Sequence, residues 1–319
     1  MKILLSAYAC EPTHSSEPSV GWNWAIELSK SQHDIYVLTR NSNKKSIDLF
    51  FRSNLKPINL NFLYFDFILL SRLKKKINFI NFYYFLWQFG AFKYALKKHK
   101  VINFDLVHHI TFVSMRFPSL MGELKIPFIL GPLAGGETAP LNLQFSLGFK
   151  GFILELIRDL SSRLSIYNPL TLLSFYRANV IYVSSDSTKK LIPIIFKNKV
   201  KIQLAIGLYD GTFNHQYKPK RTKLFSILFV GRLVAWKGIH LALKAFSLFN
   251  KKYPNSVFNI VGSGPDENKF KMLCKKLNIE SNVKWISWTS KVNLDKFYLL
   301  SNIFLFPSLH DSGGLVVLE

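Results

Sequence analysis

Cysteine is scarce in this sequence: Cys10 and Cys274 are the only two among 319 residues. Two such distant cysteines exclude a disulfide-stapled scaffold and any CxxC metal or redox motif, and they fit a reducing compartment. Acidic residues are also few, since 19 Asp and Glu face 42 Lys and Arg, for a formal net charge of +23. Apolar residues make up 49% of the chain, which excludes general disorder. The length fits about two domains.

A positive charge of this size attracts anionic partners such as nucleic acid, acidic lipid or a phosphorylated ligand. A general drift of amino-acid usage toward Lys would give the same number, and the sequence leaves both explanations open. Zinc-finger spacing, an aromatic RNP-type strand and a long basic arm are all missing. We therefore expect no specific nucleic-acid binding.

Long uninterrupted apolar runs are missing as well. The run after Met1 has about six apolar residues, short of the ~7–15 of a signal peptide. The aromatic stretch 77–96 is nearly long enough to span a bilayer, but polar residues interrupt it and lysines flank it. Two interpretations stay open. We favour a core helix whose lysines reach solvent; the other is attachment of residues 73–100 to an anionic membrane surface at its inner face.

Strand-length apolar runs alternate with longer amphipathic segments, and this alternation predicts parallel α/β sheets. Helices are expected over 20–31, 151–178, 237–250 and 266–277. The polar segment 206–222 breaks the pattern and is interpreted as a linker. We therefore predict two Rossmann-like parallel-sheet domains that face a cleft, over 1–205 and 223–319. The expected strands are 2–9, 34–39, 59–65, 106–110, 127–131, 180–184 and 200–204 in the first, and 225–231, 257–262, 283–285 and 303–307 in the second.

The expected second domain is short. It stops about six residues into a helix, where an isolated helix needs ~12–15. We expect a C-terminally truncated form with an incomplete second domain, and the sequence does not tell whether such a form is active.

A basic motif, GRLVAWKG over 231–238, follows one expected strand and opens the next helix. A turn of this kind presents free N–H groups, and Arg232 and Lys237 add two positive charges. Such a site suits a diphosphate, whose charge it would stabilise without a metal ion. No Asp-x-Asp pair occurs in the chain, so no metal site is expected. A basic helix start on a solvated face would have the same spacing.

A second motif, HDSGGLVVLE over 310–319, places Asp311 and Glu319 eight residues apart. Carboxylates accept hydrogen bonds from sugar hydroxyls, and the two glycines let the backbone approach a ligand closely. The spacing by itself is weak, because surface acids recur at it by chance.

Together the two motifs resemble the donor site of retaining glycosyltransferases of family 4, which have the GT-B fold. Segments 9–24, 108–112, 131–137 and 261–265 are similar to further motifs of that family in the same order. The resemblance implies transfer of a sugar from a nucleotide diphosphate donor to an acceptor hydroxyl, with retention of anomeric configuration. It implies a nucleotide-sugar co-substrate, no cofactor, and a glycan or lipid-linked acceptor in polysaccharide biosynthesis, in the cytoplasm.

In that family's arrangement the C-terminal domain binds the donor. Arg232 and Lys237 would then bind the diphosphate, Glu319 would hold the nucleotide ribose, and residues 285–288 would lie near the base. The donor sugar would contact Asp311 and the backbone of Ser312, Gly313, Gly314 and Leu315. Asp311 departs from the Glu that the family usually has and is one methylene shorter, so the loop must come closer or a different hydroxyl is bound.

The acceptor-side N-terminal domain would supply the remaining groups. Gly21, expected in the first loop, would let the backbone close on the sugar and phosphate. His108 or His109 would lie beside the reacting centre, and since they are adjacent on a strand only one can face the cleft. Two alternatives to the enzyme stay open: a non-catalytic membrane-surface binding protein that keeps the fold, and nucleic-acid binding through charge alone.

Overall fold

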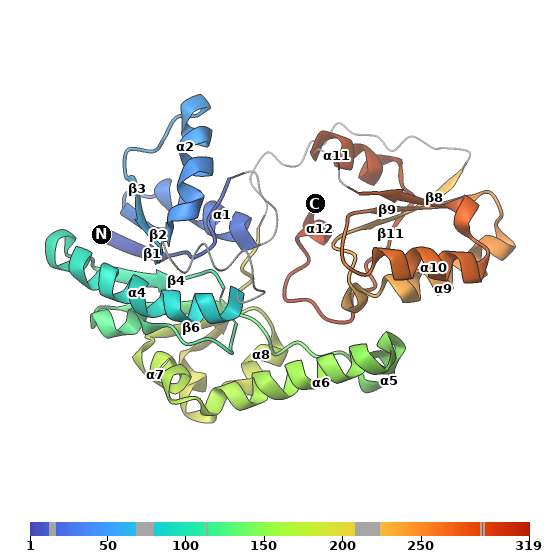
Figure 1. The fold of residues 1–319 in the computed structure, drawn as a ribbon. Helices are drawn as coiled ribbons and strands as arrows, with labels where there is room; N and C mark the ends of the chain where they lie inside the picture. Colours follow the sequence, from blue (N-terminus) through green and yellow to red (C-terminus); the bar gives the residue numbers. More distant parts are fainter. Residues whose placement is uncertain (13–16, 68–79, 113, 208–223, 288, 290) are drawn as a thin grey trace. The chain divides into compact units, whose positions relative to one another are not determined.

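The computed structural model divides the chain into two compact units, each built on a parallel sheet (Figure 1). It describes residues 1–12, 17–67, 80–112, 114–207, 224–287, 289 and 291–319. Unit 1 comprises Met1–Glu137 and Arg158–Ile206, and unit 2 comprises Thr138–Ile157 and Gly207–Glu319. Residues 138–157, which the sequence analysis counts with the first domain, thus belong to unit 2. Most of the expected linker lies outside the described residues.

The sheet of unit 1 has seven strands in the order β3-β2-β1-β4-β5-β6-β7, and every neighbouring pair is parallel. The first strand lies inside the sheet, as in doubly wound folds. Every strand expected in this part of the sequence is present. The strands are β1 (Lys2–Ser6), β2 (Asp34–Arg40), β3 (Leu60–Phe65), β4 (Leu106–His109), β5 (Phe128–Leu133), β6 (Val180–Val183) and β7 (Val200–Ile202).

Helices connect these strands. They are α1 (Glu17–Ser29), α2 (Lys44–Ser53), α4 (Ile80–Ile102), α7 (Pro169–Arg177) and α8 (Asp186–Leu191), with 3-10 turns at Asn41–Asn43, Leu120–Leu124, Ser165–Tyr167 and Ile194–Lys199. Between β5 and α7 the chain forms α5 (Leu141–Gln144), the turn Phe145–Leu147 and the long α6 (Gly148–Leu164).

The prediction of one helix over 151–178 is wrong. Helix α6 ends at Leu164, and α7 starts afresh at Pro169. Proline has no N–H to continue the hydrogen bonding of a helix, and it disfavours helical backbone at the residue before it. Asn168 is therefore extended, and its side chain caps α7 by accepting the Leu170 N–H at 2.9 Å.

The aromatic stretch forms a core helix over the part that the structure describes. Tyr84 and Trp87 of α4 are fully buried and contact the ring of Tyr8, which follows β1, in a core cluster that also holds Leu38 of β2. This agrees with the favoured interpretation, although residues 68–79 lie outside the described ranges. Over those ranges, no helix combines the length and the apolarity needed to cross a bilayer.

Unit 2 has a four-stranded parallel sheet in the order β10-β9-β8-β11. Its core is formed by Phe229, Phe246, Phe258 and Ile260, which are buried between the sheet and its helices. All four strands lie where the apolar runs predict them. The elements are β8 (Phe225–Val230), α9 (Ile239–Lys252), β9 (Ser256–Val261), α10 (Glu267–Leu277), β10 (Val283–Ile286), α11 (Lys291–Leu300), β11 (Ile303–Phe304) and α12 (Leu315–Leu318), with turns at Ala235–Lys237 and Glu280–Asn282.

Candidate active site

The basic loop of unit 2 follows β8 and lies against the residues that follow β11. Leu233 and Val234 are buried, and the turn Ala235–Lys237 leads into α9. Gly238 has the left-handed φ of 72°, and a Cβ there would lie 1.9 Å from the Pro307 carbonyl oxygen. Only glycine permits both the conformation and this close approach. The contact places Lys237 beside the carboxyl end of β11.

Lys237 and Asp311 form an ion pair across that contact. Both side chains are about four-fifths buried, with 22% and 21% exposed. The Lys237 ammonium also lies 5.3 Å from the centre of the Phe306 ring, and Asp311 accepts the Gly313 N–H at 3.2 Å. Two predicted site residues that are 74 positions apart in the chain are therefore in direct contact.

The remaining predicted donor residues lie around this pair in different ways. Ser312 is exposed, and Gly313, Gly314 and Leu315 lead into α12 with a 3.1 Å hydrogen bond from the Leu315 N–H to the Gly313 carbonyl. Glu319 lies at the other end of α12 and accepts a long 3.5 Å hydrogen bond from the Tyr298 hydroxyl of α11. Burial and the Glu319 carboxylate together raise the pKa of Tyr298 above its ordinary value.

Arg232 is exposed, and among the described residues it forms no ion pair. Its loop is held by the segment after β9: the Leu233 N–H donates to the Ser263 carbonyl at 2.9 Å. Asp266 accepts the Ala235 N–H at 3.0 Å. Asp266 is not among the predicted site residues, although its place after Gly-Ser-Gly-Pro at a strand end is a usable signal.

A second contact that the sequence analysis missed fixes the loop of Asp311. The Nε2 of His310 lies 3.1 Å from the carboxylate Oε2 of Glu155 on α6. The His310 ring also stacks on Trp236 of the basic loop, with centroids 6.3 Å apart and planes 12° apart. Ser146, which belongs to the same segment 138–157 as Glu155, hydrogen-bonds His240 of α9 at 2.8 Å. These polar contacts attach segment 138–157 to the rest of unit 2.

In unit 1, His108 and His109 end β4 and are both buried. The Nε2 of His108 lies 2.8 Å from the Gly131 carbonyl, while His109 contacts Ser6 at 3.1 Å and the Tyr84 hydroxyl at 3.0 Å. Burial lowers the pKa of His108 to about 4 and that of His109, beside it, to about 3. Both rings are therefore neutral near pH 7. Because both ring nitrogens of His109 contact neighbours, its position is that of a packed core group, and the catalytic role of either histidine stays a prediction.

Gly21 is not in the first loop, where it was expected, but inside helix α1. A Cβ at Gly21 would lie 2.0 Å from the Ala9 carbonyl oxygen. The close packing of α1 against the end of the β1 segment therefore explains this glycine without a ligand. Its proposed contact with the donor stays untested.

Glu137 of unit 1 joins the turn after β5 to the start of α8. Its carboxylate accepts hydrogen bonds from Ser185 at 2.6 Å, from Thr188 at 2.8 Å and from the Gly135 N–H at 2.8 Å. Burial alone would raise the pKa of Glu137, but these hydrogen bonds outweigh it and lower the pKa below the ordinary value. The side chain is therefore a charged anchor for the turn after β5.

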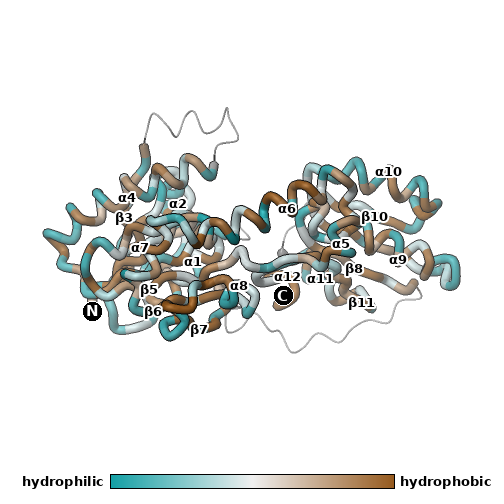
Figure 2. The backbone as a smooth tube through the Cα atoms, turned by 90° about the horizontal axis from the view of Figure 1, so that it is seen from below, coloured by the Kyte–Doolittle hydropathy of each residue, from teal (hydrophilic) through white to brown (hydrophobic). Residues whose placement is uncertain are grey.

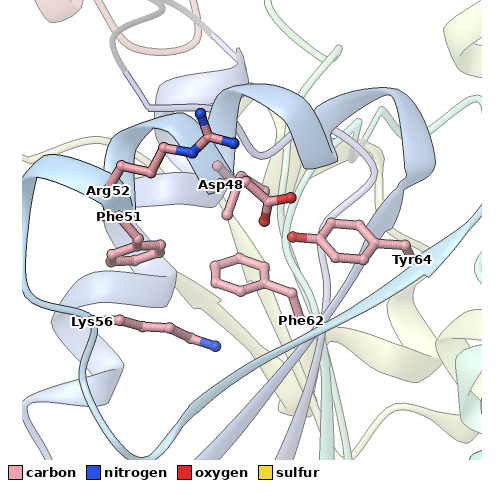
Figure 3. Close-up of a pocket in the computed structure, with 7 residues that line it drawn as sticks. Asp48, Phe51, Arg52, Lys56, Phe62 and Tyr64 are labelled. Atoms are coloured by element: carbon pink, nitrogen blue, oxygen red, sulfur yellow. The ribbon is translucent and has the colours of Figure 1, made fainter.

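A hollow of about 250 Å³ opens between α2 and β3 of unit 1 (Figure 3). Asp48 and Arg52 of α2 line it, together with Lys56, whose ammonium lies 5.8 Å from the centre of the Phe62 ring. None of the predicted site residues lines this hollow.

The described residues hold no cluster of three or more His, Cys, Asp or Glu side chains arranged to bind a metal ion. The absence of such a cluster does not show how the chain reacts with a ligand, so metal-free chemistry stays a prediction. The predicted residues fall into two groups, with the Lys237–Asp311 pair and its loop in unit 2 and His108, His109 and Gly21 in unit 1. Their convergence on one cleft stays a prediction as well.

Comparison with known proteins finds similarity to glycosyltransferases, and the family-model match lies in the part of the chain that holds the Lys237–Asp311 pair. Residues 210–319 match the family model described as Glycosyl transferases group 1. An uncharacterised glycosyltransferase of Methanocaldococcus jannaschii is 30% identical over 192 residues, which cover 56% of this chain and 46% of that protein. One from Haemophilus influenzae is 40% identical over 126 residues, covering 39% and 35%. The capsular polysaccharide biosynthesis glycosyltransferase CapM of Staphylococcus aureus is 26% identical over 220 residues, covering 63% and 52%. The matches thus span a third to a half of these relatives.

The solved structures show the same fold. Anabaena HepE in complex with UDP aligns with a TM-score of 0.58 at 12% identity, over 97% of this chain and 74% of HepE. The predicted fold class, α/β with two Rossmann-like parallel-sheet units of the GT-B type and a smaller second unit, is confirmed.

Proposed function

We propose that this chain, with its group 1 glycosyl transferase match over residues 210–319, transfers a sugar from a nucleotide diphosphate donor to an acceptor hydroxyl. The observation that carries the proposal is the Lys237–Asp311 pair. It lies where β8 and its neighbour β11 end, and in open parallel sheets ligands bind outside the carboxyl ends of the strands.

The pair suggests how the donor is bound. A diphosphate offers Lys237 a stronger anionic partner than Asp311, and exposed Arg232 adds a second cation. Asp311, released from Lys237, then accepts a hydrogen bond from a donor sugar hydroxyl, while the backbone N–H groups of 312–315 contact the sugar. Glu319 holds the ribose. Fixed positive charge of this kind stabilises the charge that grows on the departing diphosphate.

The transfer we propose retains the anomeric configuration and uses no metal ion or cofactor. The bond from the sugar C1 to the phosphate oxygen breaks, and the acceptor oxygen bonds to C1 from the same face. The acceptor proton passes to the leaving phosphate oxygen. In this scheme the protein contributes position and charge stabilisation, and His108 or His109 of unit 1 lies beside the reacting carbon.

For the acceptor we propose a glycan or lipid-linked sugar of polysaccharide biosynthesis, made in the cytoplasm. The resemblance to family 4 and the similarity to CapM support this choice.

Calorimetric titration with UDP, GDP, ADP and CDP tests the proposal. We expect at least one nucleotide to bind, and Lys237→Ala to weaken that binding about tenfold or more, because a charged hydrogen bond contributes ~1.5–3 kcal/mol. Lys244→Ala is the matched control, since Lys244 is an exposed lysine of α9. Binding of no nucleotide, or equal binding by the Lys237→Ala and Lys244→Ala variants, would contradict the proposal.

A further inference from the structure

Helix α6 and the segment before it expose an unusual amount of apolar surface. Phe149 is 84% exposed, and the others are more than a third exposed. We call this set the α5–α6 face. Its members are Leu141, Leu143, Phe145, Phe149, Leu154, Leu156, Ile157, Leu160 and Leu164.

The face follows the period of a helix. Phe149, Leu156, Leu160 and Leu164 recur at intervals of four or seven residues, so they share one side of α6. The opposite side is polar and points inward, where Glu155 is 6% exposed. The rings of Phe145 and Phe152 stack with centroids 4.6 Å apart, which joins the segment before α6 to the helix. Much of α6 is coloured hydrophobic in Figure 2.

The charges around the face have one sign. Glu155 and Asp159 are the only acids in residues 141–167, and both are engaged elsewhere, with His310 at 3.1 Å and with Arg158 at 2.7 Å. Lys150 and Arg163 are exposed near the two ends of α6. The outward side of the helix therefore combines large apolar side chains with cations and carries no exposed acid.

We propose that the α5–α6 face binds the surface of an anionic lipid bilayer, with α6 lying in the plane of the interface. Apolar side chains flanked by Lys and Arg are the chemistry of interfacial helices: the apolar atoms enter the acyl boundary and the cations contact anionic headgroups. This inference is independent of the proposed transfer reaction.

This membrane-binding face differs from residues 73–100, the stretch that the sequence left open as a membrane contact. Within the described part of that stretch, α4 buries Tyr83, Tyr84 and Trp87 in the core of unit 1. Of its large apolar side chains up to residue 100, those that are more than a third exposed are Phe82, Phe89 and Leu96.

Flotation of the whole chain with vesicles of phosphatidylcholine and phosphatidylglycerol in equal amounts tests the proposal. The triple variant Phe149→Ser, Leu156→Ser and Leu160→Ser should lower the partition coefficient at least about tenfold, because three large side chains no longer enter the lipid. The control carries Ile194→Ser, Ile195→Ser and Leu248→Ser, whose side chains are 69–80% exposed but lie outside the face. It should float as the unmodified chain does.

A charge-deletion pair tests the lipid class. Lys150→Gln with Arg163→Gln should weaken flotation on the anionic vesicles, while Lys275→Gln with Lys276→Gln on α10 should not. Vesicles of phosphatidylcholine alone should bind less of the unmodified chain. Circular dichroism checks that each variant is folded, and nucleotide titration checks unit 2 separately, so that loss of flotation is distinct from failure of the proposed function.

Four results would overturn the proposal. One is no flotation of the unmodified chain, and another is equal flotation by the face variant and its control. The third is loss of flotation in Phe82→Ser, Phe89→Ser, Leu96→Ser but not in the face variant, which would place the contact on α4. A self-association seen by size-exclusion chromatography that disappears in the face variant, without lipid binding, would make the face a protein interface instead.

Discussion

Glu155 and His310 are 155 positions apart in the chain, yet the Glu155 Oε2 and the His310 Nε2 lie 3.1 Å apart. His310 immediately precedes Asp311, which pairs with Lys237. A carboxylate on α6 therefore holds the loop that we propose binds the donor sugar.

If Glu155 positions this loop, replacement of Glu155 should weaken binding of the donor more than binding of the acceptor. We expect Glu155→Ala to weaken nucleotide-sugar binding about three- to tenfold. A hydrogen bond to a charged group contributes ~1.5–3 kcal/mol, and only part of this free energy is expected to affect donor binding, because the rest affects the stability of the loop itself. Glu155→Gln should recover part of the affinity, because its amide oxygen can still accept from His310.

The measurement is steady-state kinetics of a chain that shows transfer activity, with donor and acceptor varied separately. A rise in donor KM without a change in acceptor KM supports positioning. Glu267→Gln, which removes one partner of an ion pair with Lys271 on α10, is the control. Equal loss in both KM values would assign Glu155 a purely structural role.

The Lys237–Asp311 pair should be energetically coupled even without ligand. Each residue is about one-fifth exposed, so removing either partner leaves a poorly solvated charge. We expect Lys237→Met and Asp311→Asn each to destabilise the fold by about 1 kcal/mol, and the double variant by less than the sum. Urea unfolding of the four proteins measures this coupling. Strict additivity of the two changes would mean that the pair is not formed in solution.

A side chain at Gly238 would destabilise the fold in two ways, through backbone strain and through a steric clash, and a second glycine helps to separate the two. Gly238 and Gly148 have nearly the same φ, 72° and 73°, but a Cβ at Gly148 meets nothing within 4 Å. Gly148 has a ψ of 169°, in a region that is essentially restricted to glycine, whereas Gly238 has a ψ of 15° in the left-handed region. Gly148→Ala should therefore cost only this backbone strain, about 1–3 kcal/mol. Gly238→Ala should cost clearly more, because its Cβ would lie 1.9 Å from the Pro307 carbonyl oxygen. Thermal or urea unfolding measures the difference. Similar losses in both variants would show that the Lys237 loop does not lie against β11 as described.

The free energy of unfolding should fall as the solution is acidified from pH 7. Burial lowers the pKa of His108 to about 4 and of His109 to about 3, from an ordinary value of 6.5. Below pH 6.5 the unfolded chain therefore binds protons that the folded chain does not. The stability that the neutral rings contribute is present above pH 6.5 and is lost progressively toward pH 4, by at most about 1.4 kcal/mol per pH unit for each ring.

Urea unfolding between pH 7 and pH 4.5 measures this dependence. The His109→Gln variant should be less stable at pH 7, but its stability should fall less steeply with acidification. An unchanged slope in that variant would show that His109 is not buried as a neutral ring.

The sequence predicted the strands well because buried parallel strands are short apolar runs, and all eleven expected runs form strands. The resemblance to family 4 also placed Lys237 and Asp311 in one site, and in the structure the two motifs follow β8 and β11, which are neighbours in the sheet. The sequence pattern missed the break before Pro169, where the apolar period of α6 and α7 continues across the turn. Local pattern cannot indicate a contact such as Glu155–His310, because nothing near either residue specifies the other.

The division of the chain has a practical consequence for dissecting the molecule. The polypeptide passes from one unit to the other at 137–138, at 157–158 and at 206–207. A gene cut at the third crossing would therefore separate the donor-side sheet from its own α5 and the first half of α6. His240 would lose Ser146, and His310 would lose Glu155. Any minimal nucleotide-binding protein made from this chain would have to carry residues 138–157 in trans or spliced onto a new terminus.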